Sequence, residues 1–178
     1  MNETTRPAYD IADLKRLMER LRDPETGCPW DLKQTYQSIA PYTLEECLEL
    51  IDALERSDLE HVEEELGDLL FQVIFYSQLG KEEGRFDFDS VVSGITAKLL
   101  RRHPHVFKDG ELEGVITDRA SIETIKSNWE AEKAAERAAR AQQSAMDDVP
   151  TTLSALARAQ KLQKRASSLG YDFSSADS

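Results

Sequence analysis

Apolar residues recur along most of the chain at intervals of three and four, the spacing of an amphipathic α-helix. The first such stripe covers residues 11–21, and Asp10 stands before it in the N-cap position. Glycine and proline residues divide the rest of the pattern into separate segments, so the sequence predicts an all-α fold built as a helical bundle. Further helices are predicted over residues 43–56, 58–79, 88–102, 121–141 and 151–168.

The third predicted helix carries apolar side chains on nearly every face, and a helix of that kind must be buried on every side. A thin bundle of helices cannot surround it, whereas packing against a second copy would complete the burial. We therefore expect a homodimer or a larger homo-oligomer. The residues concerned are Leu66, Leu69, Leu70, Phe71, Val73, Ile74, Phe75, Tyr76 and Leu79.

Composition narrows the classes of function. The chain of 178 residues has a formal net charge of −12, which argues against nucleic-acid binding because that activity needs a basic surface. Two cysteines are too few for a disulfide framework, so we expect reduced thiols and a cytoplasmic setting. The polar N-terminus is unlike a secretory signal, and no apolar run reaches the roughly 18–20 residues that cross a bilayer, so no membrane partner is expected.

Two pairs of carboxylates stand at helical spacing among apolar residues. Glu46 and Glu49 form the first pair, with Glu45 just before it, and Glu65 and Asp68 form the second. Members of an i,i+3 pair share a helix face, with Cβ atoms roughly 5–6 Å apart. Carboxylates gathered near a core repel one another unless a cation lies between them. Hard oxygen ligands at this density suit Mg²⁺, with Mn²⁺ as a substitute.

A helical hairpin would bring the two pairs together, because they lie at similar distances from the predicted turn near residues 56–58. Four carboxylates at one level would then make a magnesium site with positions left for water and phosphate. Two alternatives stay open. The acidic residues form a solvated helix face, or Glu46 completes a capping box with Thr43 while Glu45 takes part of the metal role.

A basic group follows at the end of the fourth predicted helix. Lys98 and Arg102 are an i,i+4 pair, and Arg101 is three residues after Lys98, so the three cations could clamp a phosphate chain. The alternative is a cationic helix C-terminus favoured by the helix dipole. His103 and His105 flank a proline beyond that end and could also touch phosphate.

Trp30 lies in a predicted loop and could stack on a nucleobase, with Asp31 or Gln34 as hydrogen-bond partners. The alternative is a core aromatic residue that anchors the loop. The sequence contains no Walker A motif, no GxGxxG and no serine nucleophile elbow. Phosphate handling would therefore depend on a metal and on cationic side chains.

Several segments together resemble the MazG family of nucleoside triphosphate pyrophosphohydrolases. The family signature, EExxE and then ExxD after a spacer, is present as Glu45-Glu46-Cys47-Leu48-Glu49 and Glu65-Leu66-Gly67-Asp68. The likeness extends over about residues 10–170. The other similar segments are residues 27–31, 67–72, 83–88 and 101–107.

The resemblance implies an all-α pyrophosphatase fold that dimerises through its helices, with the domain over residues 1–145 and a C-terminal helix and tail over residues 146–178. It implies Mg²⁺-dependent hydrolysis of a nucleoside triphosphate to the monophosphate and pyrophosphate. Glu45 would be a second-metal ligand or would position the attacking water, and Trp129 and Lys133 would help to close the site. The implied metal ligands are Glu46, Glu49, Glu65 and Asp68, and the implied phosphate contacts are Lys98 and Arg102.

Many members of that family carry two such domains in tandem, and no second EExxE and ExxD set follows in this sequence. We expect broad base specificity, because only one stacking residue can be named. Two other functions stay open: a catalytically silent dimerisation or regulatory module, and a narrower enzyme for particular deoxynucleotides.

Overall fold

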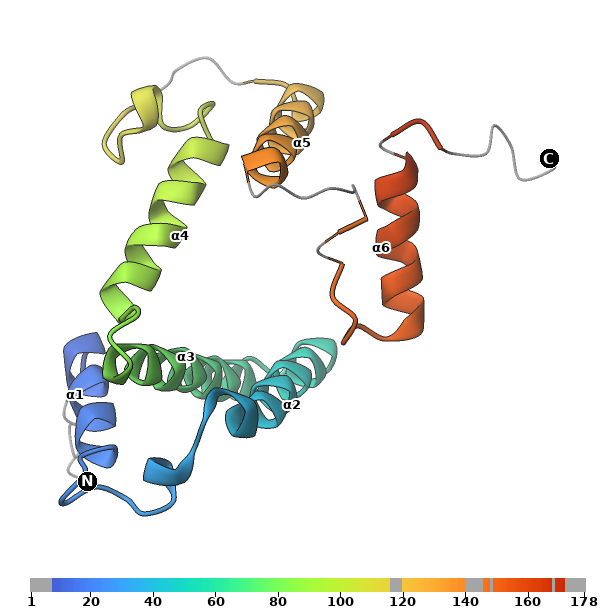
Figure 1. The fold of residues 1–178 in the computed structure, drawn as a ribbon. Helices are drawn as coiled ribbons and strands as arrows, with labels where there is room; N and C mark the ends of the chain where they lie inside the picture. The colour runs from blue at the N-terminus through green and yellow to red at the C-terminus, as the bar shows by residue number, and fades with distance from the viewer. Residues whose placement is uncertain (1–7, 116–119, 140–145, 148, 168, 172–178) are drawn as a thin grey trace. The chain divides into compact units, whose positions relative to one another are not determined.

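The computed structural model describes residues 8–115, 120–139, 146–147, 149–167 and 169–171, without the side chains of residues 133–135 and 137–139. These residues form α-helices and two short 3₁₀-helices with no strand among them, so the all-α prediction is confirmed (Figure 1). The elements are α1 (Ile11–Leu21), η1 (Asp31–Lys33), α2 (Tyr36–Glu55), α3 (Leu59–Glu82), α4 (Phe88–Arg102), η2 (Lys108–Gly110), α5 (Ile122–Ala139) and α6 (Ala155–Ser167).

The chain divides into two compact units, residues 1–98 and residues 99–178. Each unit is described by itself. The domain boundary expected between residues 145 and 146 is a different kind of division and stays a prediction. Among the residues that the structure describes, no helix combines the length and the apolar character that crossing a membrane requires.

The core of the first unit forms where α1, α2 and α3 meet. The antiparallel α2–α3 hairpin turns at residues 56–58, where Ser57 adopts a left-handed backbone with φ of 56°. Asp58 then caps α3 by accepting from the backbone N–H of His61. The buried side chains of the core are Met18, Ile39, Ile74, Phe75 and Leu79.

The expected start of α2 is wrong, since the helix begins at Tyr36 rather than at Thr43. Thr35 and Ser38 form a reciprocal capping box that starts the helix earlier, and Pro41 is carried inside it. Thr43 consequently has no cap to make, and its hydroxyl lies 2.9 Å from the Tyr76 hydroxyl on α3. The capping role considered for Glu46 is thereby excluded.

The end of α3 also differs from the prediction, because Gly80 lies inside the helix, which runs on to Glu82. A side chain at Gly80 would collide with the ring of Phe86, 2.7 Å from the place of its Cβ. Gly84, with φ of 64°, makes the turn that follows. The glycine that ends the helix is thus Gly84, while Gly80 is required for the close approach of Phe86.

Candidate active site

Three carboxylates from the two helices of the hairpin converge. Glu46 and Glu49 on α2 and Glu65 on α3 each offer an oxygen atom, and these atoms all lie within 4.8 Å of one another. Glu46 and Glu65 are half-buried, whereas Glu49 is exposed. The convergence predicted from the spacing of the two acidic pairs is present in these three residues.

Polar contacts between the helices lie close to the cluster and fix the alignment of the hairpin. The Thr43 hydroxyl bonds to the Ile39 carbonyl on its own helix and approaches the Gln72 side-chain oxygen at 3.4 Å. The contacts of Thr43 with Gln72 and Tyr76 hold α2 and α3 in one register, one helical turn before Glu46. Such a register holds Glu46 and Glu65 opposite each other.

The electrostatics of the cluster are those of crowded negative charge. Burial raises the pKa of Glu46, and the charges of Asp68, Glu49, Glu65 and Glu45 raise it further. Burial likewise raises the pKa of Glu65, and Glu49 and then Asp68 add to the effect. A divalent cation would relieve this repulsion, and an all-carboxylate donor set is the kind that Mg²⁺ and Mn²⁺ prefer. The residues present therefore fit a hard divalent metal.

Asp68 and Glu45 lie beside the cluster. Both side chains are exposed, and neither belongs to the group of three converging carboxylates. Their charges nevertheless act on the pKa of Glu46, which places both of them near it. Asp68 as the fourth ligand therefore stays a prediction.

Three of the predicted cationic residues lie on α4. Lys98 is half-buried and is the last residue of the first unit. In the second unit, Arg102 donates to Glu136 from Nε at 3.2 Å and from Nη2 at 2.5 Å, and Arg101 donates to the same carboxylate at 2.5 Å. These hydrogen bonds, with that of Arg102 first, lower the pKa of Glu136 to about 2. Both guanidinium groups thus already hold a carboxylate.

Trp30 is 51% exposed, so the alternative of a core aromatic residue is wrong. It packs edge-on against Tyr42, with ring centroids 6.0 Å apart. Gln34 binds locally, since its Nε2 donates to the Trp30 carbonyl at 3.0 Å and its Oε1 accepts from Ser38. The side chain of Asp31 is buried. Half of the Trp30 surface is thus accessible, and the two partners suggested for a bound base are engaged or buried.

Trp129 lies on α5 in the second unit, and its ring centroid is 6.2 Å from that of His103. His103 in turn lies 5.5 Å from His105, measured between ring centroids. Lys133 is on the same helix, but its side chain lies outside the described part of the chain. The aromatic residue predicted to help close the site is thus grouped with both histidines.

Comparison with known proteins agrees with this geometry. Residues 34–107 match the family model described as the MazG nucleotide pyrophosphohydrolase domain. The nucleoside triphosphate pyrophosphohydrolase of Escherichia coli is 52% identical over 163 residues, which is 92% of this chain and 59% of that protein. The MazG nucleoside triphosphate pyrophosphohydrolase/pyrophosphatase of Thermotoga maritima is 39% identical over 161 residues, which is 90% of this chain and 58% of that protein.

Residues 34–107 of the chain form a MazG domain. The chain spans about three fifths of the length of these two relatives. A solved structure of a mazG-related protein from Thermotoga maritima supports the fold, with a TM-score of 0.53 at 23% identity over 67% of this chain and 98% of that one. The family named from the sequence motifs is confirmed.

His61 is a residue of the MazG domain that the sequence argument did not single out. Its Nδ1 lies 2.6 Å from the Asp58 carboxylate, and this hydrogen bond raises the pKa of His61. Its charge acts to lower the pKa of Glu65, against the effect of the neighbouring carboxylates. The sequence could have predicted that His61 lies near Glu65, because His61 precedes Glu65 by one helical turn.

Magnesium is expected to stabilise the MazG domain more strongly as pH rises. The raised pKa values of Glu46 and Glu65 mean that the folded protein binds protons more tightly than the unfolded chain, so metal-free stability falls as pH rises from the ordinary carboxyl pKa through the raised value. Bound metal needs the deprotonated ligands and opposes that loss.

Melting curves measured between about pH 4.5 and 8, with and without Mg²⁺ at about 100 times its dissociation constant, test this, because that excess gives about 2.7 kcal/mol. NaCl at matched ionic strength is the control. A rise in melting temperature that is equal with both salts, or independent of pH, would contradict the metal site.

Proposed function

We propose that this MazG domain hydrolyses nucleoside triphosphates to the nucleoside monophosphate and pyrophosphate. The observation that supports it is the convergence of Glu46, Glu49 and Glu65 within 4.8 Å, on the helices that carry the EExxE and ExxD motifs. The names of the relatives give the substrate class. With Asp68 as fourth ligand, these residues would hold Mg²⁺, or Mn²⁺ in its place.

The ion, when bound, supplies positive charge to phosphate oxygens and makes a water more acidic. The water oxygen attacks the α-phosphorus, the bond from that phosphorus to the bridging oxygen breaks, and pyrophosphate leaves. Glu45, exposed beside Glu46, orients the water and accepts its proton. Lys98, Arg101 and Arg102 contact the phosphate chain, and Lys98 and Arg102 offset the charge on the leaving pyrophosphate.

Glu136 competes with the phosphate chain for Arg101 and Arg102 in this proposal. Its carboxylate occupies Arg101 and Arg102 in the geometry that a phosphate would use. A triphosphate that reaches these guanidinium groups must displace it, so helix α5 releases the arginines as substrate binds. Trp129 and Lys133, on the same helix, then help to close the site.

Base recognition is proposed to be loose. The exposed face of Trp30 stacks on the nucleobase, and stacking is tolerant of base identity. The amide of Gln34 is engaged and Asp31 is buried, so neither of these two residues is placed to select one particular base. A broad role in nucleotide-pool housekeeping fits this arrangement.

A homodimer is proposed as the working assembly. Leu66 on α3 is 53% exposed and Leu48 on α2 is 56% exposed. An apolar surface of this kind on the hairpin is suited to a second copy of the same hairpin. The other large exposed hydrophobic residues on these two helices are Tyr42, Leu44, Ile51, Leu54, Leu59, Leu70 and Val73.

The chemistry also suggests where the protein works. The net charge of −12 argues against a nucleic-acid partner. Cys28 and Cys47 are free thiols, in keeping with a reducing cytoplasm.

One assay tests the proposed reaction. The protein is incubated with Mg²⁺ and a panel of nucleoside and deoxynucleoside triphosphates, and the products are separated and identified. Monophosphate and pyrophosphate in equal amounts from most of the panel are expected. Orthophosphate as the first product would mean that another bond is cut, and turnover confined to one or two deoxynucleotides would mean a narrow enzyme. No product would favour a silent dimerisation or regulatory module.

A further inference from the structure

The first turn of α4 is where that helix is attached to α1 and α3 of the first unit. Phe88 packs against the core cluster, and Phe86, just before the helix, lies against Gly80 of α3. No described side chain of α4 is buried, so the rest of the helix adds little packing. The chain enters α4 through Gly84, whose positive φ marks a left-handed turn after α3. The direction of α4 therefore depends on few contacts.

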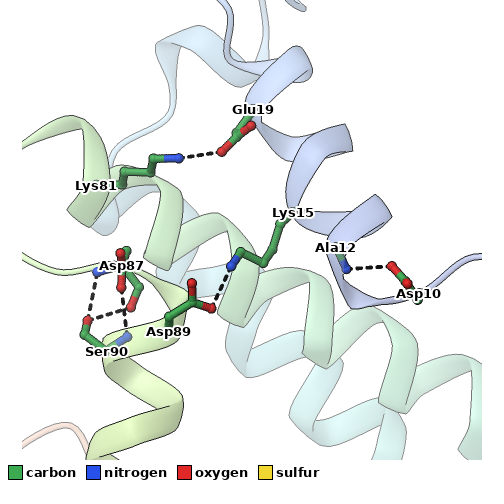
Figure 2. Close-up of polar contacts among 8 residues, drawn as sticks. All are labelled: Asp10, Ala12, Lys15, Glu19, Lys81, Asp87, Asp89 and Ser90. Atoms are coloured by element: carbon green, nitrogen blue, oxygen red, sulfur yellow. Dashed lines mark hydrogen bonds and ion pairs between the residues drawn. The ribbon is translucent and has the colours of Figure 1, made fainter.

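An ion pair adds the polar contact at this attachment. Lys15 on α1 donates to the Asp89 carboxylate at 2.6 Å, and its ammonium also lies 5.5 Å from the centre of the Phe88 ring. Figure 2 shows Lys15 reaching from α1 to Asp89 at the start of α4, while Lys81 on α3 reaches Glu19 on α1. Lys15 thus contacts both residues that begin α4.

A shallow cavity separates these elements. Its volume is about 70 Å³, and its lining includes both ion pairs and the ring of Phe88. It lies away from the carboxylate cluster, none of whose members lines it. The space beside Phe88 leaves room for α4 to tilt unless Lys15 holds Asp89 in place.

A tilt of α4 would displace Lys98 by an amount that follows from helix geometry. Lys98 lies nine residues after Asp89, so the helical rise places it about 13 Å along α4. A rotation of about 10° at the first turn would move Lys98 by about 2 Å, and a misplacement of about 1 Å can cost a hundredfold in rate. An exposed ion pair is weak, but a small change in its position at the start of α4 produces a larger displacement at Lys98.

We propose that Lys15 and Asp89 are positioning residues, whose ion pair fixes the direction of α4 and so the place of Lys98 on the triphosphate. The inference rests on the proposed function for the role of Lys98, while the orientation of α4 can be measured without any substrate. Its geometric basis is the set of contacts of Lys15 with Asp89 and Phe88.

Charge reversal tests the pair. Lys15→Glu and Asp89→Lys are each expected to raise KM for the triphosphate about fivefold and also to lower kcat, because Lys98 contacts the bound phosphate chain and offsets the charge on the leaving pyrophosphate. The double variant restores the pair in reverse and should return KM to near the wild-type value. A role in folding alone would lower kcat through a smaller active fraction and leave KM unchanged.

The matched control is the second ion pair, Lys81 with Glu19, which joins α1 to α3, while Lys81 acts on Asp89 of α4 through its charge alone. Its reversals should leave KM within twofold of wild type. If Lys81→Glu raises KM as much as Lys15→Glu, the effect is general charge at this surface and the proposal is overturned.

A distance measurement separates this proposal from the proposed reaction. Cys28 and Cys47 are first replaced by serine, and spin labels are attached at Arg16→Cys on α1 and Ala97→Cys on α4. The distance between the two labels, measured by pulsed electron paramagnetic resonance, reports the orientation of α4. Lys15→Glu should broaden or shift the distance distribution, and the double reversal should restore it, even if no triphosphate is hydrolysed. An unchanged distribution, or a changed one with unchanged KM in an active protein, overturns the proposal.

Discussion

Replacing Glu49 with glutamine is expected to lower triphosphate turnover about a thousandfold or more, with the helical content unchanged. Glutamine keeps the shape of the side chain and removes the negative charge, so the converging oxygens of Glu46 and Glu65 lose one anionic member. Because Glu49 is exposed, the substitution removes little packing. Loss of one like charge should even raise the melting temperature of the metal-free protein.

Glu55→Gln is the matched control for this variant. Glu55 is an exposed glutamate on the same helix and is not in the converging group, so turnover should stay within twofold of wild type. Steady-state rates and Mg²⁺-dependent melting curves, measured on both variants, separate metal loss from a general effect of charge. Wild-type turnover in Glu49→Gln would rule out the ligand role. Asp68→Asn in the same series tests the fourth ligand.

Helices whose ends are marked by nearby capping residues could be predicted from the sequence. The α1 boundaries are right because Asp10 accepts from backbone N–H groups of the first turn and Asp13 completes the box, all within four residues. The start of α2 was missed because Pro41 is a stronger visible signal than the Thr35–Ser38 box that in fact begins the helix. Where two signals for a helix start lie close together in the sequence, pattern alone does not decide between them, and here the Thr35–Ser38 capping box sets the start of α2.

The candidate site was predictable to the extent that it follows from helical spacing. The positions of Glu46, Glu49 and Glu65 required only two helices and a short turn between them. The pairing of Arg102 with Glu136 and of Lys15 with Asp89 depends on how distant segments dock, since the partners are 34 and 74 residues apart. No periodicity in the sequence encodes such partners.

Replacing Arg22 with alanine is expected to destabilise the protein by about 3 kcal/mol. The Arg22 side chain is only 7% exposed, and it binds Glu82 through two hydrogen bonds of 2.8 and 2.6 Å. It also donates to the Asp31 carbonyl and lies over the Phe75 ring, 5.4 Å from its centre. The substitution would leave the Glu82 carboxylate and a backbone carbonyl without this partner, at the point where the end of α1, the end of α3 and the loop before α2 meet.

Arg56→Ala is the control for this loss, because Arg56 pairs with Asp52 on an exposed surface and should matter by less than about 1 kcal/mol. For a chain of this size, the Arg22 variant should melt about 6–12 °C lower than wild type. Arg22 is the main cause of the lowered pKa of Glu82, so its contribution is fully present above the ordinary carboxyl pKa and is lost as pH falls through the lowered value. The difference in melting temperature should therefore narrow on acidification. Equal melting temperatures for the two variants at neutral pH would show that this buried pair does not hold the Trp30 loop to the helices.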